Sequence, residues 1–162
     1  MLNRVLGIDP GMSGALAVYC PSASAESGMR WHVMDIECAG EKADRRVVAP
    51  LLRDFVTRFD PEVAFVERAF VMPKQNVAAQ ARYMRAVGAI EAIVACLNIP
   101  IHFVTPQTWK KFHGLHKADK EASRALALRL FPEAADLLRR KLDHQRAESM
   151  LLAAYGARTW KG

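Results

Sequence analysis

The stretch Val5-Leu6-Gly7-Ile8-Asp9-Pro10-Gly11-Met12-Ser13-Gly14 decides the fold of this chain. A short apolar run bounded by turn-forming residues is typical of a buried strand, and the Pro-Gly and Ser-Gly pairs predict a hairpin that returns through Ala15–Tyr19. Asp9 therefore stands at the end of a core strand, where a carboxylate is costly unless it is hydrogen-bonded, paired or bound to a cation. Two interpretations stay open: Asp9 stabilises the turn by accepting backbone hydrogen bonds, or it serves a cation site.

The composition describes one ordinary domain over residues 1–162, with 51% hydrophobic and 25% charged residues. The three cysteines are odd in number and lack metal-ligand spacing, which favours a reducing compartment without disulfides. We see no targeting segment and no apolar stretch long enough to span a membrane, so we expect a cytoplasmic protein of a bacterium, or of the host cell if the chain is phage-encoded. A net charge of +6 favours an anionic partner, most commonly nucleic acid.

A second apolar run, residues 62–66, ends in Glu67 in the same way that the first run ends in Asp9. The patterns around it predict two flanking helices and a further strand, over residues 51–59, 76–98 and 99–104. Open α/β sheets place their sites at the carboxyl ends of their strands. Two acids at one such edge indicate a cation site.

Residues 110–120 form a basic segment that begins beside two aromatic side chains, Trp109 and Phe112. A solvated charged surface explains such a run, and so does a surface that follows a phosphate backbone. The lysines of this segment are Lys110, Lys111, Lys117 and Lys120.

The C-terminal segment predicts a final helix that starts near Asp143, a good N-cap residue, and carries Glu148 beside its apolar face. A glutamate in that position requires a partner, and a metal ion shared with Asp9 and Glu67 would supply one. His144 lies one turn before Glu148, where a single histidine is more often structural than a ligand.

Four segments of the chain resemble the RuvC-type Holliday junction resolvases of the RNase H-like (retroviral integrase) superfamily. They are Gly7-Ile8-Asp9-Pro10-Gly11, Val66-Glu67 with Phe70 three residues later, the basic stretch Gly114–Lys120, and Asp143-His144-Gln145-Arg146-Ala147-Glu148. The resemblance implies an α/β, RNase H-like fold in which helices flank a mixed five-stranded sheet that opens on an antiparallel meander. It also implies that Asp9, Glu67 and Glu148 are catalytic metal ligands.

The resemblance implies a fourth ligand, and here the sequence departs from the family pattern. The better-known bacterial members carry an acid or a histidine three residues before the final acid, where this chain has Gln145. We favour Asp143 as the fourth catalytic ligand because a carboxylate suits Mg²⁺, with His144 as the alternative ligand. Glu148 in place of an aspartate lengthens the reach of the final acid by one methylene.

Oxygen ligands of this kind favour Mg²⁺, with Mn²⁺ as a substitute, over zinc. By resemblance, two ions per site support hydrolysis of a DNA phosphodiester bond that leaves a 5′-phosphate. The resemblance also implies that Lys120 acts near the scissile phosphate and that Phe70 stacks on an unpaired base, the alternative being that Phe70 belongs to the core. Further DNA contacts are expected from Lys74, Arg82, Lys110, Lys111 and Lys117.

The expected function is resolution of four-way (Holliday) DNA junctions by paired symmetric nicks. Because such a junction is roughly two-fold symmetric, we expect a homodimer. The long helix over 76–98 is its expected seam, although its small residues suit core packing as well. Two alternatives stay open: a related nuclease acting on other branched or flap DNA, and a non-catalytic junction-binding protein. An actin-like or sugar-kinase ATPase, with its nucleotide cofactor, is excluded because 162 residues leave no room for a second domain.

Overall fold

The central sheet is mixed and five-stranded, as the family resemblance implied. In a computed structural model, which describes residues 4–21, 29–71, 76–115 and 120–162, its strands are β1 (Val5–Asp9), β2 (Ala15–Tyr19), β3 (Trp31–Asp35), β6 (Val63–Glu67) and β7 (Ile101–Val104). They lie in the order β3-β2-β1-β6-β7. The first three strands form an antiparallel meander, whereas β6 runs parallel to β1 and β7 parallel to β6.

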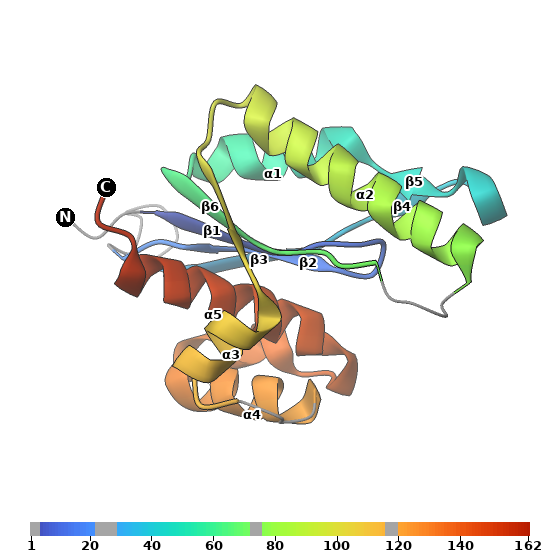
Figure 1. Ribbon diagram of the computed structural model, residues 1–162. Coiled ribbons are helices and arrows are strands. Elements are labelled where there is room, and N and C mark those ends of the chain that lie inside the picture. The colour runs from blue at the N-terminus through green and yellow to red at the C-terminus, as the bar shows by residue number, and fades with distance from the viewer. Residues whose placement is uncertain (1–3, 22–28, 72–75, 116–119) are drawn as a thin grey trace.

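Helices cover both faces of this sheet (Figure 1). On one face lie α1 (Ala49–Phe59) and α2 (Val77–Cys96). On the other face lies α5 (His144–Thr159), with α3 (Pro106–Phe112) and α4 (Lys120–Leu130) packed beside it. In the described part of the chain, no helix is both long and apolar enough to cross a membrane.

Short elements that the sequence patterns did not indicate complete the chain. A two-stranded sheet of β4 (Cys38–Ala39) and β5 (Arg46–Val47) encloses a 3₁₀ turn, Lys42–Asp44. Two further 3₁₀ segments, Pro132–Leu138 and Lys141–Asp143, connect α4 to α5.

Local signals set several helix boundaries. Pro50 lies in the first turn of α1, where its missing N–H is tolerated. The side chain of Asn76 accepts a hydrogen bond from the Ala79 N–H at the start of α2, and Thr105 caps α3 in the same way. Each of these boundaries follows from a residue type that the sequence displays.

The side chains of β1 alternate between two cores, one on each face of the sheet. Leu6 and Ile8 pack with residues of α1 and α2, whereas Val5 packs with residues of α5. Gly7 faces α5 at backbone distance: a Cβ added there would lie 2.5 Å from the Ala153 nitrogen and closer still to the Ser149 carbonyl oxygen. The middle of α5 therefore packs directly against the strand that ends in Asp9.

Candidate active site

Asp9 and Glu67 occupy equivalent positions at the ends of two parallel strands. Ile8 pairs with Val66 across β1 and β6, so the next residue of each strand is an acid. Adjacent strands lie about 4.8 Å apart, which places the two backbone positions side by side. The two acids meet at one edge of the sheet, as their spacing in the sequence predicted.

Helix α5 brings Glu148 to this edge, because the next residue, Ser149, contacts Gly7 of β1. Glu148 is only 9% exposed. Burial raises the pKa of Glu67, and the negative charge of Glu148 raises it further, against the opposing effects of a hydrogen bond from Trp109 and of the Lys110 charge. The carboxylates of Glu67 and Glu148 thus share one electrostatic neighbourhood, which also contains the charge of Lys110.

Three side chains from α3 and α4 contact these acids. The Trp109 indole donates from Nε1 to Glu67 Oε2 over 2.7 Å. Glu148 Oε1 accepts a hydrogen bond of 3.1 Å from Ser123 Oγ and lies 3.2 Å from Lys110 Nζ. Both Trp109 and Ser123 are buried, with exposures of 0% and 1%. The conformations of two acids are therefore held by groups that water does not reach.

Helix α2 contributes Tyr83 to the same region. Its ring packs against Gly11, whose φ of 123° suits a residue without a side chain. Burial raises the pKa of the Tyr83 hydroxyl, and so do the charges of Asp9 and Glu67. Asp9 and Glu67 both act on the same tyrosine hydroxyl, so Asp9 lies in the same electrostatic neighbourhood as Glu67.

Sequence patterns missed Trp109, Ser123 and Tyr83 as members of the site. The sequence showed Trp109 only as an aromatic residue at the start of a basic segment, either solvated or DNA-facing, whereas the structure buries it completely. Ser123 and Tyr83 carry no local signal, because each reaches the acids only through the packing of its helix against α5 or β1.

The donor set fits a hard divalent cation. Within residues 4–21, 29–71, 76–115 and 120–162, no three Asp, Glu, His or Cys side chains are grouped closely enough to hold a metal ion as they stand. Instead, the ammonium group of Lys110 provides the positive charge beside Glu148. Carboxylate oxygens are the donors that Mg²⁺ and Mn²⁺ prefer, so a bound ion would have to draw these side chains together.

Asp143 has a different environment from the one that its N-cap position suggested. It is the N-cap residue of α5, but its side chain makes no capping hydrogen bond. Its carboxylate turns back within the 3₁₀ turn and accepts hydrogen bonds from the Arg140 backbone N–H at 2.7 Å and from Arg140 Nε at 2.8 Å. Burial opposes ionisation of Asp143, yet these hydrogen bonds and the nearby arginine charges hold its pKa below the ordinary value. The expectation of a side-chain cap was therefore wrong.

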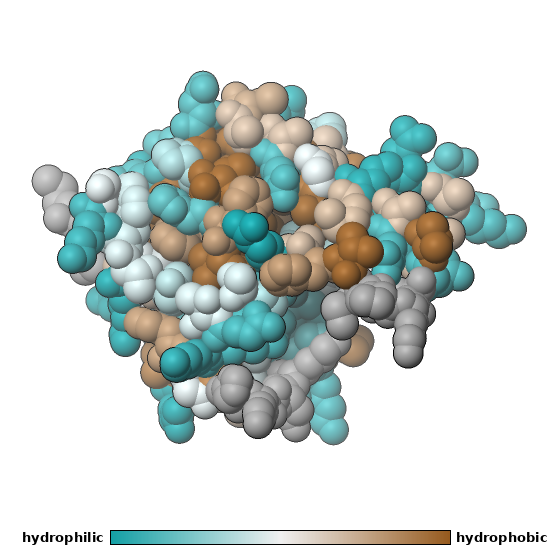
Figure 2. Space-filling view, in the orientation of Figure 1, coloured by the Kyte–Doolittle hydropathy of each residue, from teal (hydrophilic) through white to brown (hydrophobic). Residues whose placement is uncertain are grey.

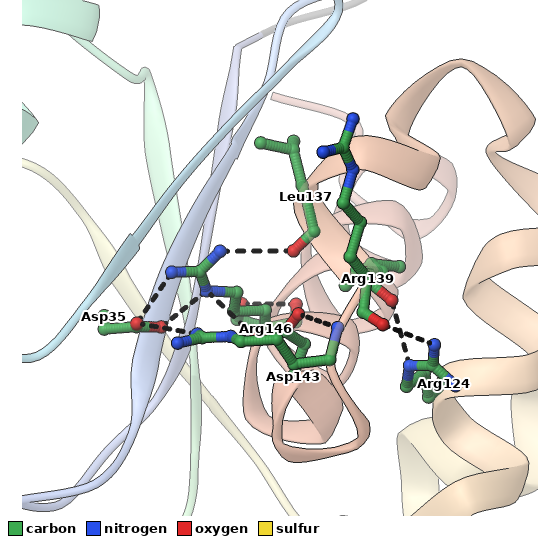
Figure 3. A network of polar contacts seen from close by, with 9 residues as sticks. Asp35, Arg124, Leu137, Arg139, Asp143 and Arg146 are labelled. Atoms are coloured by element: carbon green, nitrogen blue, oxygen red, sulfur yellow. Dashed lines mark hydrogen bonds and ion pairs between the residues drawn. The ribbon is translucent and has the colours of Figure 1, made fainter.

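Figure 3 shows that Asp143 belongs to a larger polar network at the start of α5. Arg146 donates from Nε and Nη2 to the two carboxylate oxygens of Asp35, at 2.6 and 2.7 Å, and from Nη1 to the Leu137 carbonyl oxygen. Asp35 ends β3 opposite Ala15 of β2, and Ala15 in turn lies opposite Asp9. The network therefore fastens the start of α5 to the same edge of the sheet, two strands away from Asp9.

The other candidates for the fourth ligand, His144 and Gln145, lie in the first turn of α5 and are half-buried. Neither makes a hydrogen bond or ion pair to another described residue that would bring it to Asp9 or Glu67.

The expected DNA-contacting residues fall into three groups. Phe70 is 49% exposed, so the alternative that places it in the core is wrong. Lys111 is exposed, while Arg82 and Lys110 are half-buried. Lys74 and Lys117 lie outside the described residues, and Lys120 is the first residue of α4.

Exposed hydrophobic residues mark the chain between β6 and α2. They are Phe70, Val71 and Val77. Hydrophobic surface is visible near the start of α2 in the space-filling view (Figure 2). This surface adjoins the strand end that carries Glu67.

Comparison with known proteins agrees with this geometry. Residues 5–138 match the family model of the crossover junction endodeoxyribonuclease RuvC. The RuvC protein of Paenarthrobacter aurescens (strain TC1), a curated crossover junction endodeoxyribonuclease, is 30% identical to this chain over 96% of it and 88% of its own length.

Two solved structures share the fold. T. thermophilus RuvC in complex with a Holliday junction substrate matches 96% of this chain and 95% of its own, with a TM-score of 0.64 and 21% identity. The fowlpox virus Holliday junction resolvase matches 97% of this chain and 99% of its own, with a TM-score of 0.57 and 12% identity. Both likenesses show the RNase H-like fold, and the sequence matches show the family. The chain belongs to the RuvC family of crossover junction endodeoxyribonucleases.

Proposed function

We propose that this protein is a metal-dependent endonuclease that resolves four-way DNA junctions by paired symmetric nicks. The proposal is supported by the position of Asp9, Glu67 and Glu148 near one another at the carboxyl edge of the sheet. Membership of the RuvC family supports it further. Nucleases of this family depend on divalent metal ions. The proposal makes Mg²⁺ the ion, with Mn²⁺ as a substitute and two ions per site.

Asp9, Glu67 and Glu148 would hold the metal. When bound, the ions supply an activated water and charge stabilisation at a scissile phosphate. The product would carry a 5′-phosphate. Asp143 remains the predicted fourth ligand and His144 its alternative. Because Arg140 holds both Asp143 oxygens, the Asp143 prediction requires that Arg140 release them.

The DNA would lie across the edge that carries the acids. Phe70 is exposed at the end of β6 and is available to stack on an unpaired base. The remaining contacts are proposed for basic side chains, in keeping with the net charge of +6. They are Lys74, Arg82, Lys110, Lys111, Lys117 and Lys120.

A homodimer would match the two-fold symmetry of a four-way junction. Helix α2 buries Ala86, Val87, Ile90 and Val94 against the sheet, while Met84 and Gly88 are exposed. This outer surface of α2 is the proposed seam between two copies. Sedimentation of the protein at micromolar concentration without DNA tests it, and a monomeric mass would count against the dimer.

The deciding experiment compares a labelled four-way junction with a linear duplex of the same sequence, in Mg²⁺, Mn²⁺ and EDTA. We expect symmetric nicks in the junction alone, only with metal, and none with Asp9→Asn. Asp9→Asn should keep or tighten junction binding, because it removes a negative charge beside the phosphates. Binding of the wild type without cleavage in either metal would refute the nuclease, and equal cleavage of flap substrates would refute a strict junction resolvase.

A further inference from the structure

Each of two site acids is held through one of its carboxylate oxygens by a buried donor from a different helix. Trp109 of α3 donates to Glu67 Oε2 at 2.7 Å, and Ser123 of α4 donates to Glu148 Oε1 at 3.1 Å. Among the described residues, no hydrogen bond reaches Glu67 Oε1 or Glu148 Oε2. One oxygen of each acid is thus held by a hydrogen bond from a buried group, and the other is not.

The two donors are rigid groups. Trp109 lies within the main core, and Ser123 is as buried as the core residues around it. Helix α3 is fixed to α5 because the His113 Nε2 lies 2.8 Å from the Leu151 carbonyl oxygen, one turn after Glu148. It is also capped by Thr105. The direction of the indole N–H is therefore set by packing and not by the acid that it contacts.

The acids need this support because their charges oppose each other. Glu67 is half-buried, and the negative charge of Glu148 lies near it, so a glutamate without a fixed partner would turn its carboxylate away from that charge. The Glu148 side chain has one rotatable bond more than an aspartate would have, so its carboxylate has more orientations to choose from. Lys110 alone does not fix it, since its ammonium lies on a long and partly exposed side chain.

We propose that Trp109 and Ser123 are positioning residues of the metal centre, each anchoring one oxygen of a ligating glutamate so that the other oxygen faces the ion. This inference rests on the proposed function, because it assumes that Glu67 and Glu148 ligate the metal. Partners of this kind, which do not touch the metal, orient its ligands and tune its affinity in many metal sites.

The test measures Mn²⁺ affinity of the full chain by the EPR signal of free Mn²⁺, without DNA. Trp109→Phe removes the N–H donor and keeps an aromatic ring, and Ser123→Ala removes the hydroxyl. We expect each to weaken Mn²⁺ binding by about 10- to 100-fold. Cleavage of the four-way junction should then recover as the Mn²⁺ concentration is raised.

The chain contains a matched control for each variant. Trp31 is 2% exposed, and its Nε1 has no hydrogen-bond partner among the described residues, so Trp31→Phe loses similar volume without a bond to an acid. Ser149 is fully buried and next to Glu148, but its hydroxyl donates to the Arg146 carbonyl oxygen. Trp31→Phe and Ser149→Ala should bind Mn²⁺ as the wild type does.

The outcomes separate this inference from the proposed function. If the wild type binds Mn²⁺ and cleaves, but Trp109→Phe and Ser123→Ala bind Mn²⁺ equally well, the positioning role is refuted and the nuclease stands. Equal weakening in the control variants would also refute it, since general loosening of the core would then explain the loss. If the wild type neither binds Mn²⁺ nor cleaves, the proposed function fails and takes the inference with it. The two variants lie on different helices, so a folding defect in one leaves the other to decide.

Discussion

Replacing Gly7 with alanine tests whether the contact between β1 and α5 builds the active site. The added Cβ would lie 2.5 Å from the Ala153 nitrogen and nearer still to the Ser149 carbonyl oxygen, and ordinary contact begins at 3.4 Å. Both obstacles are backbone atoms of a buried helix, so no side chain can rotate away. Helix α5 must therefore move off the sheet by about 1 Å, which is the kind of overpacking that costs roughly 1–3 kcal/mol.

Two measurable effects follow from Gly7→Ala. A loss of about 2 kcal/mol lowers Tm by about 4–8 °C in a chain of this length. The same shift carries Glu148 away from Asp9, and a displacement of about 1 Å in a catalytic group can cost on the order of 100-fold in rate. We expect both effects in thermal unfolding and in single-turnover cleavage of a four-way junction, assayed well below Tm.

Gly88→Ala is the matched control for the unfolding measurement. Gly88 lies within α2, and a Cβ added there meets no atom within 4 Å. Alanine should stabilise this helix by up to about 1 kcal/mol, because glycine is the poorer helix former. If Gly7→Ala unfolds and cleaves like the wild type, the close approach of β1 and α5 does not set the position of Glu148, and our reasoning is wrong.

Three further changes test separate parts of the molecule. Asp143→Asn should cost about 1–3 kcal/mol in urea unfolding at pH 7, because it replaces one of the two acceptor oxygens that Arg140 contacts with an NH2 donor and removes the carboxylate charge. Hydrogen bonds and arginine charges hold the pKa values of Asp35 and Asp143 below the ordinary 3.8, so their stabilisation is complete above about pH 4 and is lost as pH falls through the folded-state values. Below about pH 4, the unfolding free energy of Asp143→Asn should therefore change less with pH than that of the wild type. If the two proteins lose stability in parallel as the pH falls, the Asp143 hydrogen bonds do not stabilise the fold as described. Phe70→Ala should leave Tm unchanged, since the side chain is half-exposed, while lowering junction cleavage; a clear drop in Tm would return Phe70 to the core. Lys120→Ala should reduce the slope of log Kd against log salt for junction binding by about one, and an unchanged slope would remove Lys120 from the DNA surface.

The order of elements and two of the acids could be predicted because their signals are local. Apolar runs that end in Asp9 and Glu67 define both the strands and the edge where the acids meet, since parallel strands bring equivalent ends together. The starts of α2 and α3 follow from Asn76 and Thr105 for the same reason. Resemblance to known resolvases supplied the expectation for Glu148, which its own segment of sequence only suggested.

Only the tertiary structure decided which side chains hold the acids. Trp109 and Ser123 reach Glu67 and Glu148 from helices that lie 42 and 25 residues away in the chain, and neither residue type signals such a role. Asp143 lies at the start of α5, as its residue type predicted, but its carboxylate accepts hydrogen bonds from Arg140 and does not cap the helix. The sequence by itself determined the order and approximate extent of the main strands and helices and which acids stand at the strand ends, because those features depend on neighbouring residues. The packing of α3, α4 and α5 decided the rest, because hydrogen-bond partners across the core are set by distances in space.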